Sequence, residues 1–233
     1  MCTVTFIAKD YQDFILTSSR DELPERQTLV PKVYNEKGTN LIYPKDLLAG
    51  GTWIGVSSKK RMVNLLNGAF KPHKRKPPYR KSRGVVVKDI LLLENLLNGI
   101  MDYDYEGIEP FTIILVDWKA GLKLYNLVWD EQQLHFKELS LTSNIWSSSP
   151  LYSTEMKNER ETWFNAFLKK SNIDSTQLIK FHKTAGNGKK EENLIMDRGF
   201  IKTVSLTQII KKGDTIKMNY ENLQTGRTSC VIL

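Results

Sequence analysis

Apolar residues recur along the chain in short runs, and most of these runs come in pairs separated by a few polar residues. In the first pair, residues 2–8 and 13–19 are rich in β-branched and aromatic side chains, and the polar segment KDYQ between them is short enough for a hairpin. Three further pairs follow the same pattern: 52–58 with 61–67, 111–117 with 122–130, and 201–209 with 214–220. The pattern predicts adjacent antiparallel strands.

Between the strand pairs, apolar residues recur with the period of a helix. Residues 153–170 place their large apolar side chains on one face, and Ser153 precedes them as the expected N-cap. Residues 84–97 and 174–183 predict two further helices. Strand pairs with helices grouped between them indicate an α+β protein in which helices cover layered antiparallel sheets. Because no interdomain linker is visible, residues 1–233 are expected to form a single domain.

Composition narrows the class of protein. The chain has 233 residues, of which 40% are hydrophobic, so it can bury a substantial core. It contains no apolar run of about 18 residues that would predict a membrane span, and no signal-peptide pattern. The two cysteines, Cys2 and Cys230, fit a reducing compartment, the cytoplasm, better than a disulfide framework. We expect Cys230 to lie in the core.

The net charge of +8 is concentrated in one segment. Residues 71–83, a basic Pro-rich loop, hold 7 of the 34 Lys and Arg residues. The rest of the chain has 27 basic and 26 acidic residues, which nearly balance. The prolines prevent a regular helix or central strand, so we expect a solvated and mobile loop. Lys74, Arg75 and Lys76 are candidates for capturing an anionic ligand, the alternative being a solubilising loop. Nucleic-acid binding is not expected, because interleaved aromatic residues and a known motif are missing.

The start of the chain contains a candidate nucleophile. If Met1 is removed, Cys2 becomes the amino-terminal residue, and its small side chain favours that removal. The freed α-amino group, with an ordinary pKa of about 7.7 to 8.0, could take the proton of the thiol and return it to a leaving amine. Nucleophile and base would then belong to one residue, and no histidine would be required. The alternative is that Cys2 is a small buried apolar residue on the first strand.

The segments MCTVTFI, FILTSSRDE, AGGTWIGVS and LLNG together resemble the NRDE family, named for its Asn-Arg-Asp-Glu motif, which includes the transport and Golgi organisation protein 2 group. That family is similar to the N-terminal nucleophile hydrolases of the choloylglycine hydrolase and penicillin V acylase type. The resemblance covers most of the chain. It implies a four-layer αββα sandwich of two antiparallel sheets, in agreement with the strand pairs and helices described above.

The resemblance implies roles for three residues near the start of the chain. Cys2 matches the nucleophile, and Arg20 and Asp21 match the pair that lies beside it in the acylases. A guanidinium near the thiol favours the thiolate, and a carboxylate can hold the α-amino group by a hydrogen bond. The alternative for Arg20 and Asp21 is a solvated ion pair at a strand end.

Further site residues follow from the same resemblance. Asn67 matches an amide donor that stabilises the oxyanion, with a turn as the alternative role. Ser148 stands where the acylases have a second donor asparagine, and Trp53 is a candidate ligand contact. Two positions depart from the family pattern: Ser19 replaces the first residue of the Asn-Arg-Asp-Glu motif, and Val204 lies near the place of a late arginine of the hydrolases.

Two functions fit these residues. The first is an N-terminal cysteine hydrolase or acyltransferase that cleaves an amide or thioester bond through an acyl-enzyme. The second is a non-catalytic carrier on the same scaffold for a hydrophobic anionic ligand such as haem or a lipid-type acyl compound, as proposed for relatives in the transport and Golgi organisation group. Both take an anionic or acyl-containing small molecule. No metal or other cofactor is expected, because His73, His135 and His182 stand far apart and outside any ligand motif.

Overall fold

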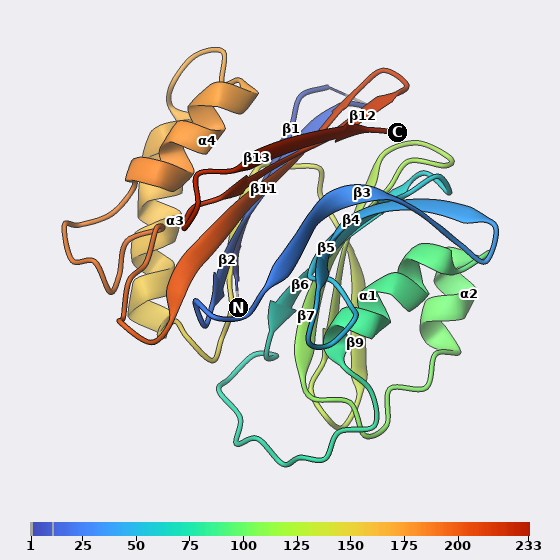
Figure 1. The fold of residues 1–233 in the computed structure, drawn as a ribbon. Helices are drawn as coiled ribbons and strands as arrows, with labels where there is room; N and C mark the ends of the chain where they lie inside the picture. The colour runs from blue at the N-terminus through green and yellow to red at the C-terminus, as the bar shows by residue number, and fades with distance from the viewer. Residues whose placement is uncertain (1, 11) are drawn as a thin grey trace. The chain divides into compact units, whose positions relative to one another are not determined.

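The computed structural model describes residues 2–10 and 12–233 and divides into two compact units (Figure 1). The first unit comprises Met1–Arg26 and Thr142–Ile232, in which Met1 and Tyr11 lie outside the described residues. The second unit comprises Gln27–Leu141 together with Leu233. Each unit is built on one antiparallel sheet with helices of its own. The expected α+β class with two antiparallel sheets is confirmed, and the single domain stays a prediction.

The sheet of the first unit has the strand order β10-β1-β2-β11-β12-β13. Its strands are β1 (Cys2–Ala8), β2 (Phe14–Glu22), β10 (Asn144–Ser147), β11 (Lys202–Lys212), β12 (Thr215–Asn222) and β13 (Thr228–Ile232). The expected hairpin of β1 and β2 is confirmed, and its register runs from the pair Cys2 and Arg20 to the pair Ala8 and Phe14. On its other side β2 pairs with β11, so that a segment from late in the chain lies beside its beginning.

Helices α3 (Thr154–Leu168) and α4 (Ser175–Thr184) cover one face of this sheet (Figure 1). Both confirm the helical periodicity of the sequence. Ser153 is the N-cap of α3 and accepts a hydrogen bond from the backbone N–H of Met156, as the sequence predicts. The cap satisfies one of the backbone donors that would otherwise be unpaired at the start of the helix.

The core between these helices and the sheet is aromatic and fixes which strand residues face the helices. Phe167 of α3 stacks on Phe181 of α4 with ring centroids 4.8 Å apart, and Ile7 and Ile15 of the sheet belong to the same cluster. Successive residues of a strand point to opposite faces. The odd-numbered residues of β1 and β2 therefore face the helices, and the even-numbered residues face away.

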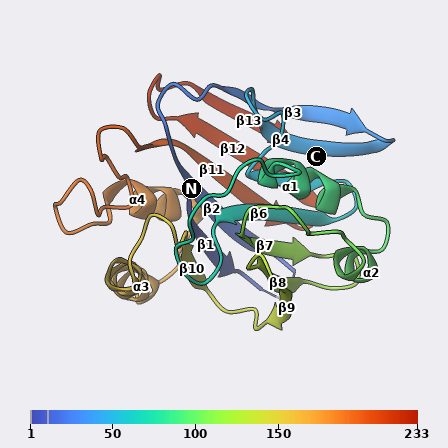
Figure 2. The ribbon, with the colours of Figure 1, turned by 90° about the horizontal axis from the view of Figure 1, so that it is seen from below.

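The second unit contains a sheet whose strands follow in chain order from β3 to β9. They are β3 (Thr28–Glu36), β4 (Thr39–Asp46), β5 (Ile54–Ser57), β6 (Arg61–Asn67), β7 (Phe111–Asp117), β8 (Lys123–Trp129) and β9 (Leu134–Leu139). Helices α1 (Arg83–Leu92) and α2 (Leu96–Met101) complete the unit, and α1 contacts β5 and β6 (Figure 2). None of the helices in the described part of the chain is long and apolar enough to cross a membrane.

Two glycines explain how closely α1 approaches the sheet. A Cβ on Gly51 would come within 2.4 Å of the backbone of Gly84, and a Cβ on Gly55 would come within 2.7 Å of the Leu91 side chain. The backbone N–H of Thr52 donates to the Gly84 carbonyl at 3.1 Å. Part of the Gly-Gly-Thr-Trp motif is thus explained by packing of the strand against the helix.

The sequence pattern missed five strands, and four of them lie at sheet edges: β3, β9, β10 and β13. An edge strand is half-covered, and the alternation of apolar residues is correspondingly faint in these segments. The fifth missed strand is β4. The single helix expected at 84–97 is wrong, because α1 ends at Leu92 and a second helix starts after Asn95. The Asn95 side chain accepts a hydrogen bond from Asn98 N–H and so caps α2.

Candidate functional site

Cys2 and Arg20 are cross-strand neighbours on the face of the first unit's sheet that points away from the helices. Cys2 is the first residue of β1, and Arg20 lies directly opposite on β2 because the short turn of the hairpin fixes the register. Both side chains are buried, with 1% and 4% of their surface exposed. The guanidinium of Arg20 is also 3.9 Å from the Glu22 carboxylate.

The thiol of Cys2 is held in its neutral form. Burial raises its pKa above the ordinary value, and the negative charge of Asp21 acts in the same direction. The positive charge of Arg20 lowers the pKa, as the sequence predicts, but burial outweighs it.

Asp21 lies on the opposite face of the same strand, toward the helices. Its carboxylate accepts hydrogen bonds from the Tyr152 hydroxyl at 2.5 Å and from the Thr203 hydroxyl at 2.7 Å. Burial raises the pKa of the Asp21 carboxyl, whereas both hydrogen bonds lower it. The expected hydrogen bond to a freed α-amino group depends on the removal of Met1, which lies outside the described residues.

A β-bulge in β11 brings Thr203 to Asp21. Thr203 pairs with Asp21 and Ser205 pairs with Arg20, so Val204 between them is the extra residue. Thr203 and Ser205 thereby face opposite sides of the sheet, although two residues of one strand that are two positions apart normally share a face. Val204 is itself buried in the place where the hydrolases were expected to have an arginine.

Ser148 directly follows β10 and contacts the same end of β1. Its backbone N–H donates to the carbonyl of Cys2 at 3.1 Å. Its hydroxyl is buried and has no hydrogen-bond partner in the described part of the chain. The structure thus brings four of the predicted site residues together in the first unit: Cys2, Arg20, Asp21 and Ser148.

Asn67 and Trp53 belong to the second unit. Asn67 ends β6 and is half-exposed, and Trp53 is buried just before β5. The register of Gly55 with Val63 places the odd-numbered residues of β6, and hence Asn67, on the face that α1 covers. The guanidinium of Arg61 confirms this orientation, since it donates to the Leu93 carbonyl at the end of α1 at 2.8 Å.

Asn64, three residues earlier on β6, is a further candidate that belongs to none of the motifs in the sequence. It is fully buried on the face away from α1, and neither its amide nitrogen nor its amide oxygen has a hydrogen-bond partner among the described residues. A buried amide without a partner is costly and often marks a functional position. A polar residue in the middle of the apolar run RMVNLLN was the available signal.

The basic loop also belongs to the second unit and is tied to its surroundings. Arg75 lies 3.4 Å from the Glu109 carboxylate, and Lys76 lies 3.1 Å from that of Glu131. His73 and Arg83 each approach Glu109 at 3.1 Å, so three basic side chains converge on one largely buried carboxylate. Lys74 is exposed. Most of the loop is exposed, as the sequence predicts, Arg75 included, whereas His73 and Arg83 are partly buried against Glu109.

The histidines and cysteines do not form a metal site. No group of three or more His, Cys, Asp or Glu side chains that could hold a metal ion occurs within residues 2–10 and 12–233. His182 is buried between Thr5 and Ser19, and its two ring nitrogens lie 2.8 Å and 2.7 Å from their hydroxyls. Cys230 is exposed, so its expected place in the core is wrong.

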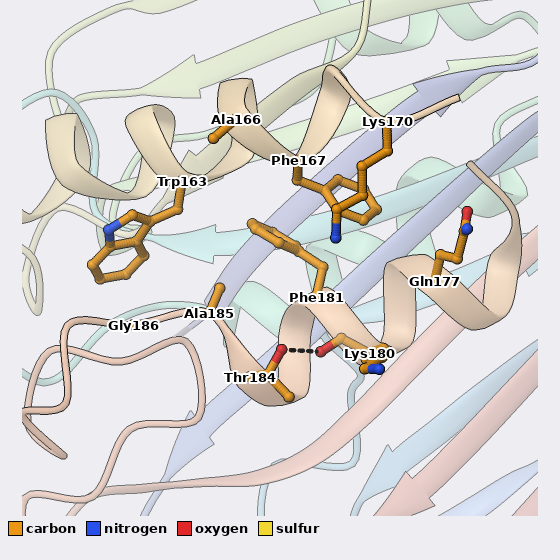
Figure 3. A pocket seen from close by; sticks show the side chains of 10 residues that line it. All are labelled: Trp163, Ala166, Phe167, Lys170, Gln177, Lys180, Phe181, Thr184, Ala185 and Gly186. Atoms are coloured by element: carbon orange, nitrogen blue, oxygen red, sulfur yellow. Dashed lines mark hydrogen bonds between the residues drawn. The ribbon is translucent and has the colours of Figure 1, made fainter. Parts of the chain in front are cut away.

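A pocket of about 500 Å³ lies between α3 and α4 and is distinct from these residues (Figure 3). Trp163, Phe167 and Phe181 line it, with Lys170 and Lys180 at one end. It belongs to the helix layer, whereas Cys2 lies on the opposite face of the sheet. None of the site residues predicted from the sequence lines this pocket.

Comparison with solved structures shows which fold this is. An N-acylethanolamine-hydrolyzing acid amidase ortholog from Caenorhabditis elegans matches with a TM-score of 0.61 and 14% identity, over 100% of both chains. Penicillin V acylase from Agrobacterium tumefaciens matches with a TM-score of 0.59 and 11% identity, over 99% of this chain and 86% of that chain. A variant of conjugated bile acid hydrolase from Clostridium perfringens matches with a TM-score of 0.59 and 10% identity, over 99% of this chain and 92% of that chain. The fold is that of the N-terminal nucleophile hydrolases.

The sequence itself has no match among curated proteins. A family model, in contrast, matches residues 1–230, which is nearly the whole chain. That model describes the family Transport and Golgi organisation 2, the group that the opening and Gly-Gly-Thr-Trp motifs resemble. The chain belongs to the Transport and Golgi organisation 2 family.

Proposed function

We propose that the protein is an N-terminal cysteine hydrolase or acyltransferase that cleaves an amide or thioester bond. The observation that carries the proposal is the cross-strand pair of Cys2 and Arg20 at the end of the sheet, next to the backbone N–H of Ser148. The hydrolase fold of the structural neighbours supports it. An acyl-containing small molecule is the proposed substrate, and the cytoplasm, where thiols stay reduced, is the proposed location.

Removal of Met1 would convert Cys2 into nucleophile and base. The neutral α-amino group takes the thiol proton, and the thiolate sulfur attacks the carbonyl carbon, forming a C–S bond and an oxyanion. Collapse of the tetrahedral intermediate breaks the C–N or C–S bond of the substrate, and the ammonium group returns the proton to the leaving group. Water or another nucleophile then releases the acyl group. The base is necessary because burial raises the pKa of the Cys2 thiol.

The other site residues have supporting roles in this proposal. Arg20 stabilises the thiolate electrostatically, and Asp21 orients the α-amino group. Asn67 and the free hydroxyl of Ser148 are proposed donors to the oxyanion. Trp53, Lys74, Arg75 and Lys76 are proposed ligand contacts. The ion pairs of Arg75 and Lys76 leave Lys74 as the cation best able to meet an anionic substrate.

A carrier for a hydrophobic anionic ligand is the second candidate. The observation that favours it is the buried, neutral thiol of Cys2, which is a poor nucleophile. In a carrier, Cys2 would only pack against the ligand, and its replacement by alanine would change affinity little.

Intact mass and turnover together test the enzyme. Natively expressed protein should lack Met1, and a panel of acyl p-nitroanilides and acyl thioesters should reveal turnover that Cys2→Ala lowers by about 10³-fold or more. The matched control is Cys230→Ser, which removes the exposed thiol and should retain full activity. Full activity in protein that retains Met1, or in Cys2→Ala, would refute the proposal. Ligand binding by Cys2→Ala without turnover by any form would favour the carrier.

A further inference from the structure

The two faces of the first unit's sheet differ in how their polar side chains are satisfied. On the face toward the helices, the hydroxyls near Cys2 are hydrogen-bonded. Arg160 of α3 donates to the Thr3 hydroxyl at 2.6 Å, and Gln208 donates to the Thr17 hydroxyl at 3.0 Å. Thr5 and Ser19 share the ring nitrogens of His182. This face has the saturated hydrogen bonding of a structural core.

On the face that carries Cys2, the hydroxyls of Ser18, Ser205 and Thr207 are equally buried, with 0%, 1% and 0% exposed, but have no partner in the part of the chain described here. The Ser18 hydroxyl lies close enough to the Cys2 thiol, and the Ser205 hydroxyl close enough to Tyr220, to lower the pKa of each neighbour, but neither contact has the distance and angles of a hydrogen bond. Buried hydroxyls without partners are uncommon because each has lost its bonds to water. Three such hydroxyls together, on one face of one sheet, call for a ligand that would satisfy them.

The strand register gathers these hydroxyls around the reactive end of the sheet. Ser205 stands opposite Arg20, which in turn stands opposite Cys2, so the three form one row across β1, β2 and β11. Thr207 and Ser18 stand opposite each other in the next row.

The third row on the same face is entirely apolar: Phe6, Leu16 and Ile209, each completely buried. Polarity on this face is therefore confined to the two rows at Cys2 and ends where the apolar row begins.

We propose that Ser18, Ser205 and Thr207, together with Arg20, bind a carboxylate carried by the acyl group of the substrate, so that the preferred acyl group is that of a dicarboxylic acid. This inference rests on the proposed function and names its substrate class. Three hydroxyl donors and one guanidinium match the oxygens of an anion. A plain fatty acyl chain would leave the hydroxyls unpaired.

Sheet geometry sets the length of that acyl group. Neighbouring strands are about 4.8 Å apart and alternate residues of a strand about 6.7 Å apart, which puts the backbones of Ser205 and Thr207 roughly 10 to 12 Å from that of Cys2. The C–S bond and the hydrogen bonds to the hydroxyls take up part of that distance, and a six-carbon diacyl group, with four carbon atoms between its two carboxyl carbons, spans the rest. Adipate, the product that hydrolysis of an adipoyl amide would release, is therefore a suitable probe.

The first test measures thermal unfolding of the full chain. Thr207→Val removes an unpaired hydroxyl and keeps the shape of the side chain, so the melting temperature should rise by about 2 °C. Its matched control is Thr5→Val on the other face, which removes a bonded hydroxyl and should lower the melting temperature. If Thr207→Val lowers it as Thr5→Val does, the hydroxyl is structural and the proposal is overturned.

The second test measures binding of adipate and of hexanoate, which has the same chain length and one carboxylate fewer, to the Cys2→Ala protein. Adipate should bind at least about tenfold more tightly, and adding Ser205→Ala and Thr207→Val should abolish that preference while hexanoate affinity changes less than about twofold. Equal affinity for the two acids, absence of adipate binding, or a preference that survives the double substitution would overturn the proposal.

These outcomes separate the inference from the proposed function. A hydroxyl-dependent preference for adipate in a protein without turnover would support the carboxylate site and refute the enzyme. Turnover of an adipoyl amide that is unaffected by Ser205→Ala and Thr207→Val would support the enzyme and refute the carboxylate site.

Discussion

Cys2 and Arg20 face each other across the β1-β2 hairpin, on the side of the sheet away from the helices. Burial raises the pKa of the Cys2 thiol, and the guanidinium opposite offsets only part of that effect. The next residue, Asp21, points to the other side, where Tyr152 and Thr203 hold its carboxylate. The Arg-Asp motif thus supplies one charge to each face of the strand.

Because the thiol of Cys2 is buried, the free energy of unfolding should depend on pH in the alkaline range. In the folded chain the pKa of Cys2 lies above the ordinary value of 9.0, so the unfolded chain loses the proton first as the pH rises. The free energy of unfolding of the wild type should therefore fall relative to Cys2→Ser above about pH 9 and run parallel to it below. Urea denaturation checks this, with protein whose intact mass shows that Met1 is retained. Curves that stay parallel across the whole range would contradict a raised pKa.

His182 should make the protein sensitive to acid. Burial, with the positive charge of Arg160, lowers its pKa from 6.5 to about 3, so between these values the unfolded chain binds a proton that the folded chain does not. The free energy of unfolding should fall as the pH decreases from about 6.5 toward about 3.

The measurement for His182 is the change in unfolding free energy between about pH 7.5 and about pH 4.5. His182→Gln, although less stable at neutral pH, should lose less over this interval than the wild type. Thr184→Ala, an exposed change on the same helix, should keep the wild-type slope. An unchanged slope in His182→Gln would mean that another group causes the acid sensitivity.

Tyr152→Phe should destabilise the first unit, because it removes the hydroxyl that donates to Asp21 and leaves the ring that stacks on Arg160, whose guanidinium carbon lies 3.6 Å from the ring centroid. A hydrogen bond to a charged group contributes about 1.5 to 3 kcal/mol, and the loss should be of that size. Thr203→Val should have a similar effect through the second bond to Asp21. Urea denaturation measures both, and a neutral result for both would contradict a stabilising role of these two hydrogen bonds.

Asn64→Leu should stabilise the protein. The substitution replaces a fully buried amide without partners by an apolar side chain of similar size, and the free energy of unfolding should rise by about 1 kcal/mol. The half-exposed Asn67 offers the control, since Asn67→Leu removes no such buried amide and should give no gain. A large loss of stability in Asn64→Leu would show that the amide is hydrogen-bonded in solution.

Glu109→Gln should release the basic loop. The substitution removes the carboxylate on which His73, Arg75 and Arg83 converge. Trypsin should then cleave after Lys74 and Arg75 faster than in the wild type, as seen by mass spectrometry. Glu131→Gln, which breaks only the exposed pair with Lys76, should leave the cleavage rate nearly unchanged. Equal rates in all three proteins would show that Glu109 does not restrain the loop.

The local features of the site follow from short stretches of sequence. The short connection between β1 and β2 sets the hairpin register, so the position of Arg20 opposite Cys2 and the orientation of Asp21 to the other face depend on this one stretch of sequence. Ser153 as N-cap of α3 is equally local. Edge strands such as β13 were missed because half of their surface is exposed and their apolar pattern is weak.

The tertiary structure alone decided how these residues are surrounded. The first hairpin is contacted by three residues from segments more than 130 residues away, Tyr152, Thr203 and His182. No local sequence pattern predicts these contacts. The direction of the Cys2 pKa shift and the absence of partners for Ser18 and Thr207 have the same origin. Alternation along a strand determines which face a side chain takes, because that depends on backbone geometry. Desolvation and hydrogen bonding depend on every atom that packs around the side chain, and those atoms come from distant parts of the chain.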